Sequence, residues 1–212
     1  MNLCVGSSVA ERVAYQPHGA GSIPSPTLQS LRVDRCAVAD IQPVIERVHY
    51  SHSIFGVTVD TCFAVRFLGS IVGGAIFGKP AGTGVIEKYS ERGKFKTTEL
   101  RRFVLTDECP RNSESRVLAV MLRDMRRDGW DRILSYADPA FGHSGVIYKA
   151  LGFRFMGKTA KRKHVMWKGK KYPDRNIHQV HFPYHLELRA ALENGTATRV
   201  EIPGKNIYLR DL

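Results

Sequence analysis

Side chains that can bind a metal or move a proton are concentrated at His49, Tyr50 and His52. They follow a predicted helix, and the two histidines are three positions apart, a spacing at which both can reach one ion on a helical turn. Solvated polar residues at a helix end give the same pattern. The spacing therefore marks a candidate site and leaves its chemistry open.

Asp138 and Tyr148 form a second candidate pair. Asp138 ends the predicted strand 132–137, where the sheet of an α/β protein opens into its crevice. Its carboxylate could accept a proton or bind a metal, and the phenol of Tyr148, on the short helix that follows, could donate a proton to a leaving group or ligate iron. The alternative is that Asp138 and Pro139 make a turn and that Tyr148 packs in the core.

Arg102 lies on a predicted strand whose strict alternation places it on the same face as Leu100 and Val104. An arginine on an apolar face needs a partner, because burying an unpaired charge is costly. The phosphate of a coenzyme or of DNA would serve, and so would a structural carboxylate.

Hydrophobic periodicity predicts an alternation of helices and strands, which is an α/β (α+β) chain. Residues 79–94 are expected to form a loop, and the tail is expected to form a helix and a hairpin of residues 197–202 with 207–209. The predicted helices are 41–48, 113–128, 144–151 and 184–193, and the other predicted strands are 62–68, 71–77, 99–105, 132–137, 153–157 and 164–167.

This order of elements resembles the GNAT acetyltransferase superfamily, which implies a central mixed, mostly antiparallel sheet flanked by helices. In that superfamily the N-terminus of a central helix holds the pyrophosphate of an acyl-CoA on its free N–H groups. The segment before helix 113–128 lacks the usual Gln-x-x-Gly-x-Gly/Ala loop. Arg111, Asn112, Ser113 and Ser115 would therefore have to contribute side chains, and the alternative is that Asn112 or Ser113 simply caps the helix.

A more specific resemblance is to the Mom family of DNA-modification proteins of Mu-like phages. It implies an enzyme that adds a carbamoylmethyl (acetamido) group to N6 of adenine in DNA, which then resists host restriction. It also implies functional roles for His49, Tyr50, Asp138 and Tyr148, iron at His49 and Tyr50, a family arginine at Arg102, and acetyl-CoA or a related acyl donor. The resemblance is carried by 49–51, 99–102, 110–115, 134–139, 143–148 and 151–153.

The charge of the chain favours a polyanionic partner. Lys plus Arg number 32 against 20 Asp plus Glu, a formal net charge of +12, and the sequence pI is about 9.8. A basic run interleaved with aromatic residues predicts contact with double-stranded DNA, although such a run is often only a solvated face. Its cations are Lys158, Lys161, Arg162, Lys163, Lys168, Lys170 and Lys171, followed by Arg175.

No apolar run approaches the ~18 residues of a membrane span, so no membrane partner is expected. The four cysteines are scattered without a Cys-x-x-Cys pair, which argues against a zinc ribbon or a disulfide scaffold and predicts a cytoplasmic protein. The oligomeric state is left open, with a homodimer as one option.

Three segments are expected along the chain. Residues 1–29 are rich in Gly and Pro and partly resemble a translated transfer-RNA gene, so they are expected to be disordered or an extension wrongly assigned to the protein. Residues 30–172 form the expected GNAT-like catalytic domain, and residues 173–212 an extension packed on it.

Two other functions fit parts of the sequence. A conventional acyl-CoA-dependent acetyltransferase could act on a small amine or a protein, although the missing glycine loop counts against it. A non-catalytic DNA-binding protein would explain the charge but not the clustered His, Tyr, Arg and Asp.

Overall fold

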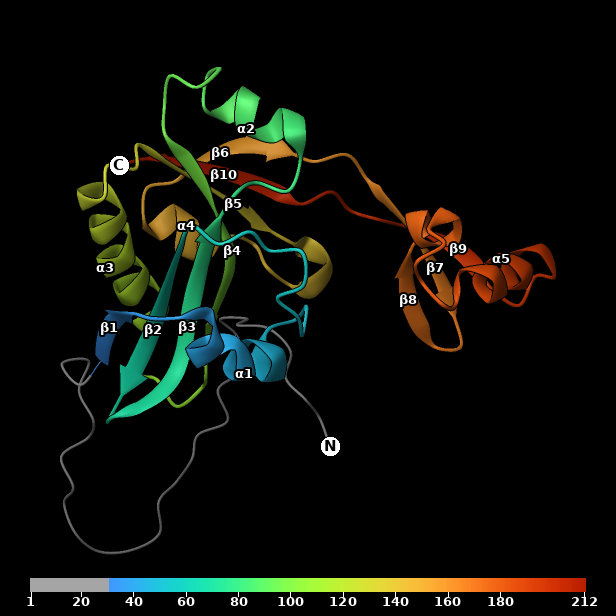
Figure 1. The fold of residues 1–212 in the computed structure, drawn as a ribbon, viewed down its shortest axis with the longest axis horizontal. Helices are drawn as coiled ribbons and strands as arrows, with labels where there is room; N and C mark the ends of the chain where they lie inside the picture. The colour runs from blue at the N-terminus through green and yellow to red at the C-terminus, as the bar shows by residue number, and fades with distance from the viewer. Residues whose placement is uncertain (1–30) are drawn as a thin grey trace, which may run out of the picture.

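The computed structural model of the protein describes residues 31–212 (Figure 1). The expectation for residues 1–29 lies outside these described residues. Strands and helices alternate along the chain, as the periodicity predicts. The strands are β1 (Leu31–Arg35), β2 (Thr61–Phe67), β3 (Ser70–Gly78), β4 (Thr97–Leu105), β5 (Arg132–Ala137), β6 (Arg154–Lys158), β7 (Arg162–Trp167), β8 (Lys170–Pro173), β9 (Thr198–Ile202) and β10 (Asn206–Asp211). The helices are α1 (Val38–Val48), α2 (Thr83–Tyr89), α3 (Ser113–Arg127), α4 (Val146–Ala150) and α5 (His185–Glu193), with 3-10 turns η2 (Pro139–Phe141) and η3 (Asp174–His178).

The larger sheet has seven strands in the order β1-β2-β3-β4-β5-β10-β6. All neighbouring strands in it are antiparallel except β4 and β5. The mixed, mostly antiparallel sheet flanked by helices is therefore confirmed. None of the helices within residues 31–212 is long and apolar enough to cross a membrane.

Helices cover both faces of the larger sheet. On one face α1 buries Ile41, Val44 and Ile45 against a cluster that includes Ile76 of β3. On the other face α3 buries an apolar stripe that includes Leu118, and α4 packs beside it. Each helix forms because its apolar residues recur with helical spacing and find an apolar sheet face to cover. The sheet is thus fixed from both sides and can position side chains at its edges.

A β-bulge in β4 changes which residues share a sheet face with Arg102. The register shifts so that Arg102 pairs with Ile76 while Leu100 pairs with Phe77, which leaves Arg101 as the extra residue. An extra residue reverses the alternation beyond it. Leu100 therefore packs in the cluster under α3 and Val104 in the cluster under α1, so the prediction that the two share one face is wrong. Arg102 is turned toward the end of α1.

The parallel pair β4 and β5 separates after a few residues. Thr97–Glu99 pair with Arg132–Leu134, and neither strand pairs with the other beyond that point. Because β4 continues to Leu105 and β5 to Ala137, the two strands diverge toward the loops that carry the candidate site.

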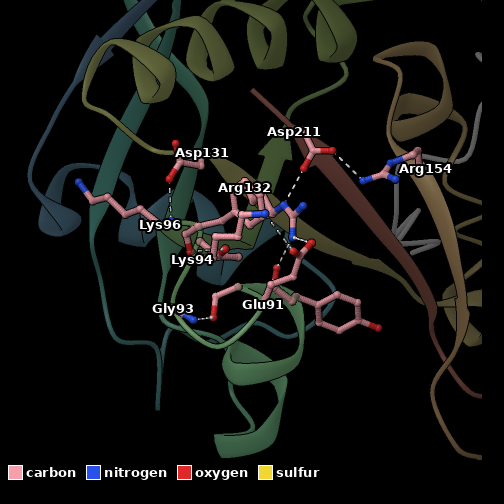
Figure 2. A network of polar contacts seen from close by, with 12 residues as sticks. Glu91, Gly93, Lys94, Lys96, Asp131, Arg132, Arg154 and Asp211 are labelled. Atoms are coloured by element: carbon pink, nitrogen blue, oxygen red, sulfur yellow. Dashed lines mark hydrogen bonds and ion pairs between the residues drawn. The ribbon is translucent and has the colours of Figure 1, made fainter.

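A buried arginine ties the opposite end of the sheet together (Figure 2). Arg132 of β5 donates from Nε to Asp211 of β10 at 2.7 Å, and its Nη1 lies 2.7 Å from Glu91. Asp211 also accepts from Arg154 of β6 at 2.7 Å. These ion pairs join three strands to the segment after α2, so this end is braced while the far end of β4 and β5 stays open.

Residues 79–94 are not only a loop. They contain α2, whose Val85 and Tyr89 pack over Leu134 and strand β10. Packing against the sheet thus stabilises a short helix that the Gly-rich composition did not suggest. β1 and β8 were also not expected from the sequence.

A small unit lies to one side of the larger sheet and is joined to it by two extended segments (Figure 1). It consists of the sheet β8-β7-β9 with η3 and α5, around a core that includes Val165, Ile177 and Leu188. We call residues 162–202 the small unit. The expected hairpin of 197–202 with 207–209 is wrong: β9 pairs with β7 in the small unit, whereas β10 enters the larger sheet between β5 and β6. The expected domain limits at residues 30, 172 and 173 stay a prediction.

Candidate functional site

His49 is buried directly after α1 and held by its own loop. Its Nδ1 lies 2.8 Å from Ser51 Oγ and accepts a hydrogen bond from the Ser51 backbone N–H at 3.1 Å. Ser51 Oγ in turn donates to the carbonyl of Ser53 at 3.1 Å. The backbone bond occupies the Nδ1 lone pair, so the neutral ring carries its hydrogen on Nε2.

The ring of His49 is neutral at ordinary pH. Burial, and after it the positive charge of Arg102, lower the pKa of His49 to about 3. A neutral imidazole with its hydrogen on Nε2 can donate a hydrogen bond to a substrate oxygen. It is poorly suited to take up a proton.

Arg102 holds the same loop from the side of the sheet. Its Nε donates to the carbonyl of Ser53 at 2.9 Å and its Nη1 to the carbonyl of Arg101 at 2.8 Å. Arg102, the residue at the position of the family arginine, therefore supports the loop after His49 and Tyr50. Its guanidinium is half-buried and has further N–H groups that can donate to a ligand.

Tyr50 stands in the middle of an aromatic group. Its ring centroid lies 4.3 Å from that of His49, 4.5 Å from Phe141 and 5.4 Å from His143. Burial raises the pKa of Tyr50, and the carboxylate of Asp138 raises it further. The phenol of Tyr50 is therefore protonated at ordinary pH.

Asp138 is the buried carboxylate of this group, 2% exposed. Its Oδ1 accepts from Arg162 Nη2 at 2.7 Å and from the Ala140 backbone N–H at 3.1 Å. Its Oδ2 lies 3.8 Å from Lys205 Nζ and is buried without a hydrogen-bond partner among the described residues. A buried acceptor without a hydrogen-bond partner destabilises the folded protein. Such an atom is expected where a substrate supplies the missing hydrogen-bond donor.

Tyr148 is packed in the core of the larger unit. Its ring lies 5.4 Å from Phe153 and 5.3 Å from Tyr208. Burial is the main reason why the pKa of Tyr148 is raised to about 12. The core alternative thus describes this residue, which is 9% exposed.

The residues at the start of α3 use their hydroxyls locally. Ser113 Oγ donates to the carbonyl of Pro110, and Ser115 Oγ donates to the carbonyl of Asn112 at 3.2 Å. Asn112 has a left-handed backbone (φ 65°) and its side chain does not cap the helix. The N–H of Ser113 donates to the carbonyl of Pro110 at 3.2 Å. The N–H groups that follow it in the first turn have no side-chain cap from Asn112, which leaves them available to an anion.

The residues of the basic run have different positions. Lys158 belongs to β6, Lys161 pairs with Glu201 at 3.2 Å, and Lys168 lies 3.9 Å from Glu187 and over the ring of Trp167. Arg162 points inward to Asp138. Three further lysines of the small unit are exposed, namely Lys163, Lys170 and Lys171.

The donor set does not fit iron. Within residues 31–212 there is no group of three or more His, Cys, Asp or Glu side chains that could hold a metal ion. Nδ1 of His49 is engaged by Ser51, and Nδ1 of His52 lies 2.9 Å from the carbonyl of Glu46, so the two histidines serve the loop. We derive no step through a metal.

Sequence reasoning missed several charged neighbours of the site. Glu99 is buried and pairs with Arg101 at 3.2 Å, and burial raises the pKa of Glu99. Lys205 approaches Asp138 from the segment before β10, and His143 lies beside Tyr50. Lys205 returns to the site only after the small unit, and no spacing signal connects it with residue 138.

Comparison of the sequence with known proteins identifies a family. The profile of the Mom protein family matches residues 30–206. The methylcarbamoylase Mom of Escherichia phage Mu is 27% identical over 161 residues, which cover 72% of this chain and 66% of that protein. The chain thus spans just under two thirds of this relative's length.

Solved structures share the fold at low identity. A GCN5-related N-acetyltransferase from Kribbella flavida is 14% identical with a TM-score of 0.51, covering 88% of this chain and 100% of that one. A ribosomal-protein-alanine N-acetyltransferase from Brucella melitensis is 12% identical with a TM-score of 0.48, covering 85% and 99%. The GNAT fold expected from the order of elements is confirmed, and within it the chain belongs to the Mom protein family.

Proposed function

We propose that this protein is a phage-type DNA-modification enzyme that adds a carbamoylmethyl (acetamido) group to N6 of adenine. The observation that carries the proposal is Oδ2 of Asp138. This buried carboxylate oxygen has no hydrogen-bond partner among the described residues, and its nearest cation, Lys205 Nζ, lies 3.8 Å away. Membership of the Mom family, whose phage Mu relative is named a methylcarbamoylase, supports this choice of substrate and group.

Asp138 would take the proton from the exocyclic amine. This amine is a weak nucleophile because its lone pair is delocalised into the ring, so bond formation to the incoming CH₂ carbon requires a base. Oδ2 accepts the N6 proton, while Arg162 and the Ala140 N–H hold Oδ1 in place.

Tyr50 and His49 would orient the reacting groups. The protonated phenol of Tyr50 can donate a hydrogen bond, and its ring with Phe141 and His143 offers an aromatic wall for an extruded base. Nε2–H of His49 can donate to the carboxamide oxygen of the transferred group. Tyr148 would supply a proton to the leaving group.

An acyl-CoA or related donor would lie at the same end of the divergent strands, where β4 leads into α3. The uncapped N-terminus of α3 would hold a pyrophosphate, with Asn112, Ser113 and Ser115 around it. In acetyl-CoA itself the thioester activates the carbonyl carbon, so the N6–CH₂ bond requires a related donor with a leaving group on the CH₂ carbon. That group departs with the bonding electrons as N6 attacks, and it takes up a proton. Plain acetyl transfer leaves an acetyl group, so the acetamido product requires a donor that carries nitrogen or gains it.

Nucleoside mass spectrometry tests the proposal. Bacteria expressing the full chain should yield deoxyadenosine with a carbamoylmethyl adduct, whereas a conventional acetyltransferase would give an acetyl adduct on another substrate. Asp138→Asn should lower the adduct by about 10²–10⁴-fold, and Tyr148→Phe should lower it too. Asp107→Asn, which changes an exposed acid before α3, is the matched control. A soluble wild-type chain that leaves adenine unmodified refutes the proposal.

A further inference from the structure

Phe55 is the most exposed large hydrophobic side chain within residues 31–212, at 88% exposure. Such an aromatic ring in water gains nothing for the fold, because the apolar surface stays unburied. It does not belong to the aromatic group around Tyr50. Among the described residues nothing covers this ring, so it is available to a binding partner.

A tight turn presents the ring of Phe55 on a fixed backbone. The N–H of Val57 donates to the carbonyl of Ile54 at 3.2 Å, and Gly56 has a φ of 70°. A positive φ at the third position is typical of a type II turn and requires Gly there. The N–H of Phe55 also donates to Ser53 Oγ at 2.9 Å. Phe55 is thus the leading residue of a braced turn.

The same turn is anchored to the candidate site. The carbonyl of Ser53 accepts from Arg102 of β4 at 2.9 Å and from Ser51 at 3.1 Å, and Ser51 contacts His49. Two residues span at most about 7 Å of chain. The backbone of Phe55 therefore lies within about two base-pair steps of Ser53, given a rise of about 3.4 Å per step.

An enzyme that acts on N6 of adenine in a duplex must take the base out of the stack. Proteins that unstack DNA commonly insert an apolar side chain between base steps. We infer that Phe55 is such a wedge: it enters the stack where the target adenine leaves, while Asp138 and Tyr50 receive the adenine. This inference rests on the proposed function. It adds that Phe55 opens the duplex so that adenine can reach the site.

Fluorescence of 2-aminopurine measures this step without the donor. Duplexes in which 2-aminopurine replaces adenine are titrated with purified full-length chain. The wild type should raise the fluorescence, Phe55→Ala should remove most of the rise, and Phe55→Leu should retain it because a leucine can also act as a wedge. Leu68→Ala is the control, since Leu68 is 66% exposed in the turn between β2 and β3.

Modification of paired and unpaired adenine provides the second measurement. Oligonucleotides with adenines in a duplex or in an open bubble are incubated with protein and a small-molecule filtrate of bacterial extract, which supplies the donor. Phe55→Ala should lower adduct formation in the duplex by about tenfold or more and leave the bubble within about twofold of wild type, because a bubble has no stack to open.

The outcomes separate the two proposals. If wild type modifies the duplex and Phe55→Ala equals it, or if Phe55→Ala loses duplex and bubble activity equally, the wedge is refuted while the proposed function stands. The second result would mean that Phe55 serves general DNA contact or another partner. If wild type modifies neither substrate, the proposed function is refuted. The wedge is refuted separately if the wild type gives no rise in 2-aminopurine fluorescence or if Phe55→Ala gives the same rise as the wild type.

Discussion

At the scale of single residues, the site is built from groups whose charge is controlled by burial. His49 and Tyr50 are held neutral, while Asp138 has two cations close by, Arg162 and Lys205. One neutral donor beside one paired carboxylate gives the two roles that amine alkylation needs, a hydrogen-bond donor for the incoming group and an acceptor for the proton.

The buried neutral His49 should make the fold sensitive to acid. The pKa of His49 is about 3 in the folded chain and 6.5 in the reference state, so between these values the unfolded chain binds more protons. Stability is therefore lost as pH falls from about 6.5 toward 3. Thermal melts of His49→Gln between pH 7 and 4 should show a shallower loss than wild type. His178→Gln, at an exposed position, should follow wild type, and equal slopes for His49→Gln would contradict this account.

Several site residues could be predicted from the sequence because they lie in the blocks that resemble the Mom family. His49 and Tyr50 lie beside the loop that follows Asp138, whereas Tyr148 packs in the core against Phe153 and Tyr208. The environment of Arg102 could not be predicted, because strict alternation of side chains along a strand assumes that no bulge is present, and β4 has a bulge at Arg101. Lys205 was also beyond reach, since its approach to Asp138 depends on the path of the chain around the small unit.

At the scale of elements, the order of helices and strands followed from periodicity, and pairing did not. The helix 113–128 was predicted almost to its ends because α3 has a clear apolar stripe. A hairpin of β9 and β10 was predicted because the two strands are close in sequence. In the structure β9 pairs with β7, and β10 pairs with β5. Strand pairing is decided by tertiary contacts that local sequence does not contain.

Two glycines beside the site separate backbone strain from close packing. Gly142 and Gly145 have similar φ values, 75° and 79°, but a Cβ on Gly142 would meet nothing within 4 Å, while one on Gly145 would lie 2.4 Å from the ring of Tyr208. Gly142→Ala should cost roughly 1–2 kcal/mol of unfolding free energy from the left-handed backbone alone. Gly145→Ala should cost an additional roughly 1–3 kcal/mol, because Tyr208 is buried and must shift. Urea denaturation measures both, and equal losses would show that Tyr208 yields freely.

At the scale of the whole molecule, the small unit carries exposed lysines and touches the site through Arg162. If the small unit binds the DNA, Arg162 connects the DNA-binding surface to Asp138, the proposed general base. The segments that connect it to the larger sheet run side by side, since the Thr159 N–H donates to the carbonyl of Lys205 at 2.9 Å.

DNA binding should depend strongly on salt. Log affinity should fall linearly with log salt concentration, and replacing Lys163, Lys170 and Lys171 with Ala should reduce the slope by about 0.9 for each phosphate that is no longer neutralised. Binding should weaken for all sequences alike, because phosphates carry no base identity. Fluorescence anisotropy with duplex DNA checks this, with Lys88→Ala and Lys94→Ala near α2 as the control. An unchanged slope in the triple variant would place the DNA elsewhere.

The position of β10 also has a consequence for biosynthesis. β10 lies between β5 and β6, yet it follows the whole small unit in the chain. A ribosome must therefore produce the small unit before residues 206–211 can fill the gap between two strands made long before. Until then β5 and β6 expose unpaired edges in the nascent chain, where chaperones can bind and aggregation can start. The larger sheet is thus completed only after the whole small unit has been synthesised.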